Sequence, residues 1–164
     1  MKTLTLAALV VALPVAAVAH DGLTVRDGYA RSANPKTAAA FMVIENHKTI
    51  DCQFGGVSSD IADKVELHSH QEVDGIMKMG RIEGGILIPA EGEHALQRGG
   101  DHIMFMGLKA PLENGQEITV SLDFGDCGVD QVTIPVDNDR APDAAPPAMD
   151  HGTGHGEGDA TQGN

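Results

Sequence analysis

Hydrophobic and polar residues alternate along most of the chain with a period of two. Because successive side chains of a strand point to opposite faces, this alternation predicts β-strands. Turn-forming pairs such as Asn34-Pro35, Asp74-Gly75 and Asn114-Gly115 separate the apolar runs. The predicted strands span residues 23–30, 39–46, 52–58, 64–70, 75–81, 86–88, 102–108, 117–124 and 129–136. We expect an all-β Greek-key antiparallel β-sandwich, with one helical turn at 59–62.

The first residues depart from this pattern and are typical of a secretory leader. Lys2 precedes an apolar stretch at 4–18, and Ala-Val-Ala at 17–19 forms a cleavage motif. The apolar run is short for a membrane-spanning helix, although an uncleaved anchor is the alternative. We therefore expect signal cleavage after Ala19 and a periplasmic protein that starts at His20 and is not inserted in the membrane. No cysteine follows the cleavage site, so we expect no lipid anchor there.

The last residues also lie outside the strand pattern. Segment 141–164 contains no aliphatic side chain larger than alanine except Met149. A segment of this kind buries too little apolar surface to offset its ordering entropy, which predicts a disordered tail. Residues 20–140 remain for one β-sandwich domain.

The composition limits the classes of partner. The formal net charge is −13 at pH 7, so nucleic acid and anionic membranes are poor ligands for this chain. An acidic protein attracts cations or a basic partner surface, and its charge also favours solubility. The charge alone does not decide between these roles.

The chain has two cysteines, Cys52 and Cys127. In an exported protein two cysteines usually pair, and a disulfide between them would stabilise the fold by about 2–4 kcal/mol. A metal site built on their thiols is the alternative.

Three predicted strands place histidine and methionine on one face. In "HIMFM", His102, Met104 and Met106 share a face, and Ile103 and Phe105 lie on the other. In "KVELHSH" the shared face carries Glu66, His68 and His70, and in "GIMKM" it carries Met77 and Met79. If these strands meet at one end of the sandwich, the fold gathers imidazoles and thioethers in one place.

This mixture of donors has a chemical meaning. Thioethers are soft, neutral ligands that favour Cu(I), and imidazole also suits copper, iron, nickel and zinc. Methionine is also a common core residue, so we interpret Met42, Met77 and Met106 as packing residues. His47 and His94 are expected to be surface or hydrogen-bonded histidines. His70 is either a spare ligand or a solvent-facing neighbour.

The stretch from "VELHSH" through "GIMKM" to "IPAEGEHALQRGGDHIMFMGLKAPLENGQEITVSLDF" resembles the periplasmic copper chaperone family PCu(A)C. The family pattern is a histidine, a methionine eleven residues later and a closing His-x-Met. His68 and Met79 have this spacing, and His102 and Met104 supply the His-x-Met. The distance from Met79 to His102 exceeds the family's by one residue, which an insertion in the connecting loop explains.

The resemblance implies a cupredoxin-like β-sandwich and a Cu(I) site made by His68, Met79, His102 and Met104. It also implies a non-enzymatic chaperone that delivers copper by ligand exchange. The implied acceptor is the dinuclear copper centre of cytochrome c oxidase, reached through an oxidase subunit or an assembly factor.

Further donors lie at the two ends. Met149, His151 and His155 fall in the tail, and cleavage would expose the amine and imidazole of His20. Nitrogen ligands suit the oxidised ion better than thioethers do. We therefore expect the tail to capture copper, as Cu(II), or to help it into the His/Met site. A solubilising tail is the alternative.

Three other functions compete with the chaperone. An electron-transfer cupredoxin needs a cysteine thiolate with two histidines, but neither histidine nor methionine follows Cys127 in "GVDQVTIPV". A copper–zinc dismutase-like enzyme needs more histidines than the predicted core supplies. A purely structural sandwich predicts no tight metal binding.

Overall fold

The computed structural model describes residues 22–141, with the side chains of 33 and 71–73 excepted. The strands are β1 (Leu23–Asn34), β2 (Thr37–Asn46), β3 (Cys52–Phe54), β4 (Gly56–Ser58), β5 (Ala62–Val73), β6 (Ile76–Arg81), β7 (Ile86–Ile88), β8 (Glu93–Leu96), β9 (His102–Leu108), β10 (Glu117–Asp123) and β11 (Val129–Pro135). One 3-10 turn, η1 (Gly125–Cys127), precedes β11. The predicted all-β class is confirmed. None of the helical residues described forms a segment long and apolar enough to span a membrane.

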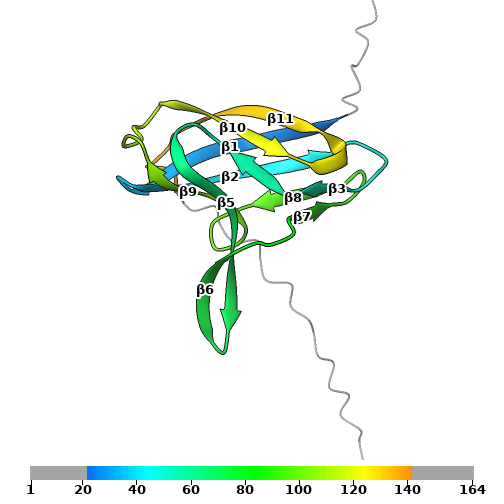
Figure 1. The fold of residues 1–164 in the computed structure, drawn as a ribbon, viewed down its shortest axis with the longest axis horizontal. Coiled ribbons are helices and arrows are strands. Elements are labelled where there is room, and N and C mark those ends of the chain that lie inside the picture. Colours follow the sequence, from blue (N-terminus) through cyan, green and yellow to red (C-terminus); the bar gives the residue numbers. More distant parts are fainter. Residues whose placement is uncertain (1–21, 142–164) are drawn as a thin grey trace, which may run out of the picture.

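The strands form antiparallel sheets that pack as a sandwich (Figure 1). The largest sheet has the order β1-β2-β9-β5-β6, and β8 pairs with β2 beside β9. A second sheet has the order β11-β10-β4, and β3 pairs with β7. A parallel bridge from Ala30 to Val136 joins β1 to the chain that follows β11. The end of the described chain therefore lies beside β1.

The core lies between the sheets and consists mainly of aliphatic side chains. β9 contributes Ile103 and Phe105, both fully buried, and β10 contributes Val120 and Leu122. Met42 belongs to the same cluster, as its packing interpretation predicted. These buried residues alternate along their strands with more exposed ones. The other face of the large sheet is therefore not part of this core, and its side chains can serve a binding site.

Three elements differ from the sequence-based expectation. The run 52–58 splits at Gly55, whose amide donates to Asp123 O, because β3 pairs with β7 and β4 with β10. Strand β8 was missed, since only Leu96 of its four residues is buried. The helical turn at 59–62 is wrong: Ser59 Oγ donates to Thr119 O at 2.6 Å, and β5 begins at Ala62.

A disulfide joins Cys52 and Cys127, so the pairing predicted for an exported chain is confirmed and the thiol metal site is excluded. Cys52 is 1% exposed and belongs to the core cluster, and Cys127 ends η1. The bond therefore ties β3 to the turn between β10 and β11.

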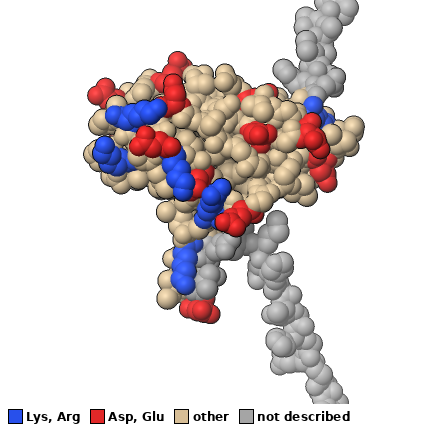
Figure 2. Space-filling model, viewed as in Figure 1, with Lys and Arg blue, Asp and Glu red and all other residues tan. Residues whose placement is uncertain are grey.

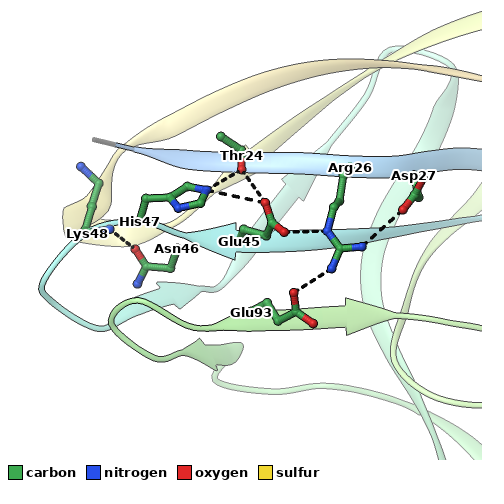
Figure 3. A network of polar contacts seen from close by, with 8 residues as sticks. All are labelled: Thr24, Arg26, Asp27, Glu45, Asn46, His47, Lys48 and Glu93. Carbon is green, nitrogen blue, oxygen red and sulfur yellow. Dashed lines mark hydrogen bonds and ion pairs between the residues drawn. The ribbon is translucent and has the colours of Figure 1, made fainter. Parts of the chain in front are cut away.

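A polar network ties β1, β2 and β8 together on the surface (Figure 3). Arg26 of β1 donates to Glu45 of β2 at 2.6 Å and to Glu93 of β8 at 2.7 Å. These hydrogen bonds raise the pKa of Arg26, and the bond from Arg26 lowers the pKa of Glu45. His47 contacts Thr24 Oγ1 at 3.0 Å, which agrees with its interpretation as a hydrogen-bonded surface histidine.

The β5–β6 hairpin projects from the body of the sandwich (Figure 1). All six residues of β6 are exposed, and basic and acidic side chains both occur on the hairpin in Figure 2. Ile76 is 61% exposed and Met77 is 58% exposed. The interpretation of Met77 as a packing residue is therefore wrong, because β6 is an edge strand and none of the described elements covers it.

Removal of the disulfide should lower the free energy of unfolding. In a Cys52→Ala/Cys127→Ala variant the cross-link no longer restrains the unfolded chain across 75 residues, which costs about 2–4 kcal/mol. Urea unfolding curves measure the difference. An exposed substitution on the hairpin, Met77→Leu, serves as the control and should leave the midpoint unchanged. Superimposable curves for the double variant and the wild type would contradict this prediction.

Candidate metal centre

Strand register brings the histidines and methionines onto one face of the large sheet. In the β5–β9 pair, His68 lies opposite His102 and Glu66 lies opposite Met104. In the β5–β6 pair, His70 lies opposite Met79. Directly opposed residues of an antiparallel pair share a face, so the gathering of these side chains agrees with the period-two prediction.

A cavity of about 260 Å³ opens on this face. Its lining includes two imidazoles and two thioethers, those of His70, Met79, His102 and Met104. Three residues of the predicted ligand set, Met79, His102 and Met104, thus line one cavity. The fourth, His68, lies beside it, with its ring 6.1 Å from that of His102.

His102 is the most deeply buried of these donors, at 3% exposed. Its Nδ1 lies 3.0 Å from Gly100 O. A carbonyl can only accept, so Nδ1 carries the proton and Nε2 keeps its lone pair. Burial lowers the pKa of His102 below its usual 6.5, which favours the neutral form that ligates metals.

His70 stacks on His102, with the ring centroids 5.1 Å apart. Its Nδ1 is buried and has no hydrogen-bond partner among the described residues. A buried nitrogen without a partner is costly. A metal ion in the cavity is one group that would satisfy it.

His68 is held by a carboxylate. Its Nε2 lies 3.1 Å from Glu66 Oε2, and its buried Nδ1 has no partner among the described residues. Glu66 is 8% exposed and is also paired with Lys64 and Arg81. Hydrogen bonds from Lys64 and His68 lower the pKa of Glu66. An ionised carboxylate that accepts one N–H of an imidazole orients the other nitrogen toward a metal.

The methionines divide into two groups. Met104 is partly buried in the cavity wall, and Met79 is 49% exposed at the cavity. Met106 shares the face of Met104 but lies opposite Thr37 and Lys64, farther along β9, and it does not line the cavity.

The other candidate residues lie elsewhere. His94 is paired with Asp101 at 3.0 Å, as a hydrogen-bonded surface histidine should be. His20, Met149, His151 and His155 lie outside the described residues, so the expectations about them remain predictions. In the described part of the chain, no three side chains drawn from His, Cys, Asp and Glu form a metal-binding cluster; the cavity donors include thioethers.

The family model described as "Putative lipoprotein LpqE-like" matches residues 23–136. The chain belongs to this LpqE-like family. A protein of Leifsonia xyli subsp. xyli (strain CTCB07), described as "Putative lipoprotein Lxx21020", is 37% identical over 116 residues, which cover 71% of this chain and 70% of that protein. Both descriptions point to an exported protein.

Solved structures of PCuAC domains share the fold of this LpqE-like chain. The Cu(I) form of DR1885 from Deinococcus radiodurans is 28% identical, with a TM-score of 0.57 over 74% of this chain and 84% of that one. The copper-bound PCuAC domain from PmoF2 has a TM-score of 0.57 at 17% identity, over 70% of this chain and 92% of that one. The fold expected from the PCu(A)C resemblance is therefore confirmed.

Sequence reasoning missed the aromatic and cationic part of the LpqE-like cavity. Phe41, Arg31 and Arg98 line it, and Tyr29 packs against Phe41 with the ring centroids 5.2 Å apart. Arg98 is one of 11 lysines and arginines in the sequence, and no local pattern distinguishes it. Nothing local marks Arg31 or Phe41, which β1 and β2 bring from far away in the sequence.

The tautomer of His102 can be observed directly. In the metal-free protein at neutral pH we expect His102 to carry its proton on Nδ1, because Gly100 O accepts from that atom. Long-range ¹H–¹⁵N correlation spectra distinguish the two tautomers. Free histidine in the same buffer gives the reference pattern. A proton mainly on Nε2 would contradict the geometry.

Proposed function

We propose that the cavity binds Cu(I) through Met79, His102 and Met104, with a fourth donor from the His68-Ser69-His70 segment. The observation that carries this proposal is the convergence of two thioethers and two imidazoles on one cavity. The buried Nδ1 atoms of His68 and His70, which have no hydrogen-bond partner among the described residues, support the proposal, as does the unprotonated Nε2 of His102.

The donor set favours Cu(I) by its softness and its neutrality. Thioether sulfur suits Cu(I), whereas carboxylates and water suit hard divalent ions. A structural zinc site would use thiolates or more imidazoles and carboxylates, and both cysteines of the sequence are joined in the disulfide. The same bond removes the thiolate that a blue-copper electron-transfer site requires.

Similar proteins of known structure support the proposal. DR1885 from Deinococcus radiodurans was solved in a Cu(I) form, and it is 28% identical to this chain. The PCuAC domain from PmoF2 was solved with copper bound. We extend copper binding from those proteins to this chain because the four cavity donors offer the matching chemistry.

We propose His70 as the fourth donor. It lines the cavity and lies directly opposite Met79, whereas His68 is engaged by Glu66. The family spacing instead points to His68, whose Nδ1 would become the ligand atom. The two sets differ by one imidazole and are separable by mutation.

The chain would act as a copper chaperone rather than as an enzyme. Met79 is half exposed on the projecting hairpin, so an incoming ligand can reach the metal and replace the protein's donors stepwise. We propose that the protein works in the periplasm and hands Cu(I) to a copper-accepting protein. The acceptor that the resemblance implies is the dinuclear centre of cytochrome c oxidase or its assembly factor.

An anaerobic Cu(I) competition titration with a chromophoric chelator tests the site. We expect one tight equivalent in the wild type. Met104→Leu should weaken it at least about tenfold, or about 1.4 kcal/mol, because the variant keeps the apolar volume and loses the sulfur donor. Met106→Leu on the same strand face is the matched control and should bind like the wild type.

The outcome that would overturn the site is equal Cu(I) affinity in the Met104 and Met106 variants. Thermal unfolding of the metal-free variants checks that both remain folded. If the wild type itself shows no tight equivalent, the purely structural sandwich becomes the better interpretation.

The two histidines can be ranked in the same titration. We expect His70→Ala to weaken Cu(I) binding at least about tenfold and His68→Ala to weaken it less, because His70 lines the cavity and His68 is engaged by Glu66. His94→Ala, on the same sheet but paired with Asp101, is the control. Loss of the tight site in His68→Ala alone would instead establish the set given by the family spacing.

A further inference from the structure

Two guanidinium groups and a hydroxyl share the cavity with the histidines and methionines. Arg31, Ser32 and Arg98 all line it, although the chain is acidic, with a formal net charge of −13 at pH 7. Every ion pair of an arginine or lysine found in the described part of the chain involves other residues. Arg31 and Arg98 therefore have no carboxylate partner among the described residues.

Polar atoms of this group also lack hydrogen-bond partners. The side-chain Nε of Arg98 and the Oγ of Ser32 are buried, and neither has a partner among the described residues. Arg98 Nη2 donates to Arg140 O at 2.7 Å. Arg31 Nε donates to Asn138 O at 3.1 Å. These carbonyls use only part of the five N–H donors that each guanidinium carries, and a buried donor without an acceptor is costly, so the group fits an acceptor that binds in the cavity.

The chemistry of the cavity wall favours an organic carboxylate as that acceptor. A guanidinium presents its N–H groups as a planar fork that matches a carboxylate or a phosphate. Ala39, Phe41 and Met104 give the same cavity an apolar wall, and pockets that combine apolar walls with a few polar groups bind small organic ligands. The aliphatic part of an organic acid gains free energy by burial against such a wall, whereas a phosphate has no apolar part to bury.

The cavity has room for a carboxylate beside a metal ion. Its volume is about 260 Å³, and a cavity needs only about 10–15 Å³ to hold one water molecule. Phe41 adjoins both sets of polar groups. Its ring centroid lies 6.0 Å from the guanidinium carbon of Arg98 and 6.1 Å from the ring centroid of His102. A carboxylate on Arg98 would therefore lie near the proposed copper ligands and use none of their donor atoms.

We propose that Arg31, Ser32 and Arg98 form a subsite for an organic carboxylate. The two guanidinium groups and the Ser32 hydroxyl donate to the carboxylate oxygens, and the aliphatic part of the ligand lies against Ala39 and Phe41. The subsite needs no metal, because none of its donors is a proposed copper ligand.

A bound carboxylate would also strengthen the retention of copper, a consequence that rests on the proposed function. Cu(I) held by neutral donors keeps its positive charge, which the charges of Arg31 and Arg98 repel. An anion on the two guanidinium groups reduces this repulsion. Coupling between two sites is reciprocal, so Cu(I) would in turn raise the affinity of the subsite for a carboxylate.

The first experiment uses metal-free protein, so it does not depend on whether the cavity binds copper. The chain without its predicted leader, residues 20–164, is labelled at its methionine methyl groups and titrated with sodium propionate. Sodium chloride at equal ionic strength is the reference. We expect a saturable shift of the Met104 methyl resonance with propionate, no such shift with chloride, and no response of Met42 in the core.

Variants locate the bound carboxylate. Arg98→Gln should weaken propionate binding at least about tenfold, because charge-assisted hydrogen bonds are lost. Arg98→Lys keeps the charge but loses the fork, and its affinity should fall between those of the glutamine variant and the wild type. Arg31→Gln, at an exposed residue, should also weaken binding and provides the test if Arg98→Gln does not fold. Lys48→Gln removes one positive charge outside the cavity lining and should bind propionate like the wild type.

A second ligand decides where the carboxylate comes from. A blocked tripeptide with one central aspartate offers the same group on a peptide backbone. Tighter binding of propionate would assign the subsite to a free organic acid. Tighter binding of the tripeptide would assign it to an acidic side chain of a protein partner. Either ranking supports a carboxylate subsite.

The coupling to copper is measured by the chelator competition that tests the copper site. Saturating propionate should raise the Cu(I) affinity of the wild type several-fold. It should have no effect on Arg98→Gln, which also controls for a direct action of propionate on the chelator. Equal Cu(I) affinity of the wild type with and without propionate would contradict the coupling.

Three results would overturn the subsite itself. The first is that propionate causes no saturable shift of Met104. The second is that chloride reproduces the shift, which would reduce it to charge screening. The third is that Arg98→Gln and Arg31→Gln are both folded and bind propionate like the wild type. Because these measurements contain no metal, failure of the subsite and failure of the proposed function are distinguishable.

Discussion

Strand β9 lies in the middle of the large sheet, hydrogen-bonded to β2 on one side and to β5 on the other. Its register sets His102 opposite His68 and Met104 opposite both Ala39 and Glu66. A slip of one residue would turn all of these side chains to the other face. Burial of Ile103 and Phe105 prevents such a slip, so the packing of the core determines which face of the sheet carries the histidines and methionines.

The same register carries a cost that packing alone does not offset. His68 and His70 each have a buried Nδ1 without a partner among the described residues, and an unsatisfied buried polar atom destabilises a fold by about 1–3 kcal/mol. An apolar side chain at either position would remove this cost. Buried nitrogen atoms without a hydrogen-bond partner are expected in a protein that binds a ligand there, because the ligand supplies the missing partner.

Much of this arrangement follows from the sequence by elementary rules. The period of two placed His102 with Met104 and His68 with His70, and both pairs lie on the predicted faces. The period-two alternation could not decide between His68 and His70 as the histidine of the cavity, because both share that face. Only the pairing of β5 with β6 sets His70 opposite Met79. The exposure of Met77 also escaped prediction, since an edge strand that projects from the body has the same alternation as a covered one. Arg31, Arg98 and Arg140 come from β1, the β8–β9 loop and the end of the described residues, and only the tertiary fold brings them together.

If the cavity binds Cu(I) as proposed, the positive charges around it favour release of the ion over storage. A Cu(I) ion held by neutral donors keeps its unit charge, and the guanidinium groups of Arg31 and Arg98 line the same cavity. The positive charges of Arg31 and Arg98 would repel a Cu(I) ion bound in the proposed site, and solvent would screen this repulsion most for the exposed Arg31. Such repulsion would oppose retention of the ion and favour its release. A carboxylate that paired with the arginines would reduce the repulsion. Retention and release in the proposed site would then depend on groups that never touch the metal, while the soft donors would keep the selectivity for Cu(I).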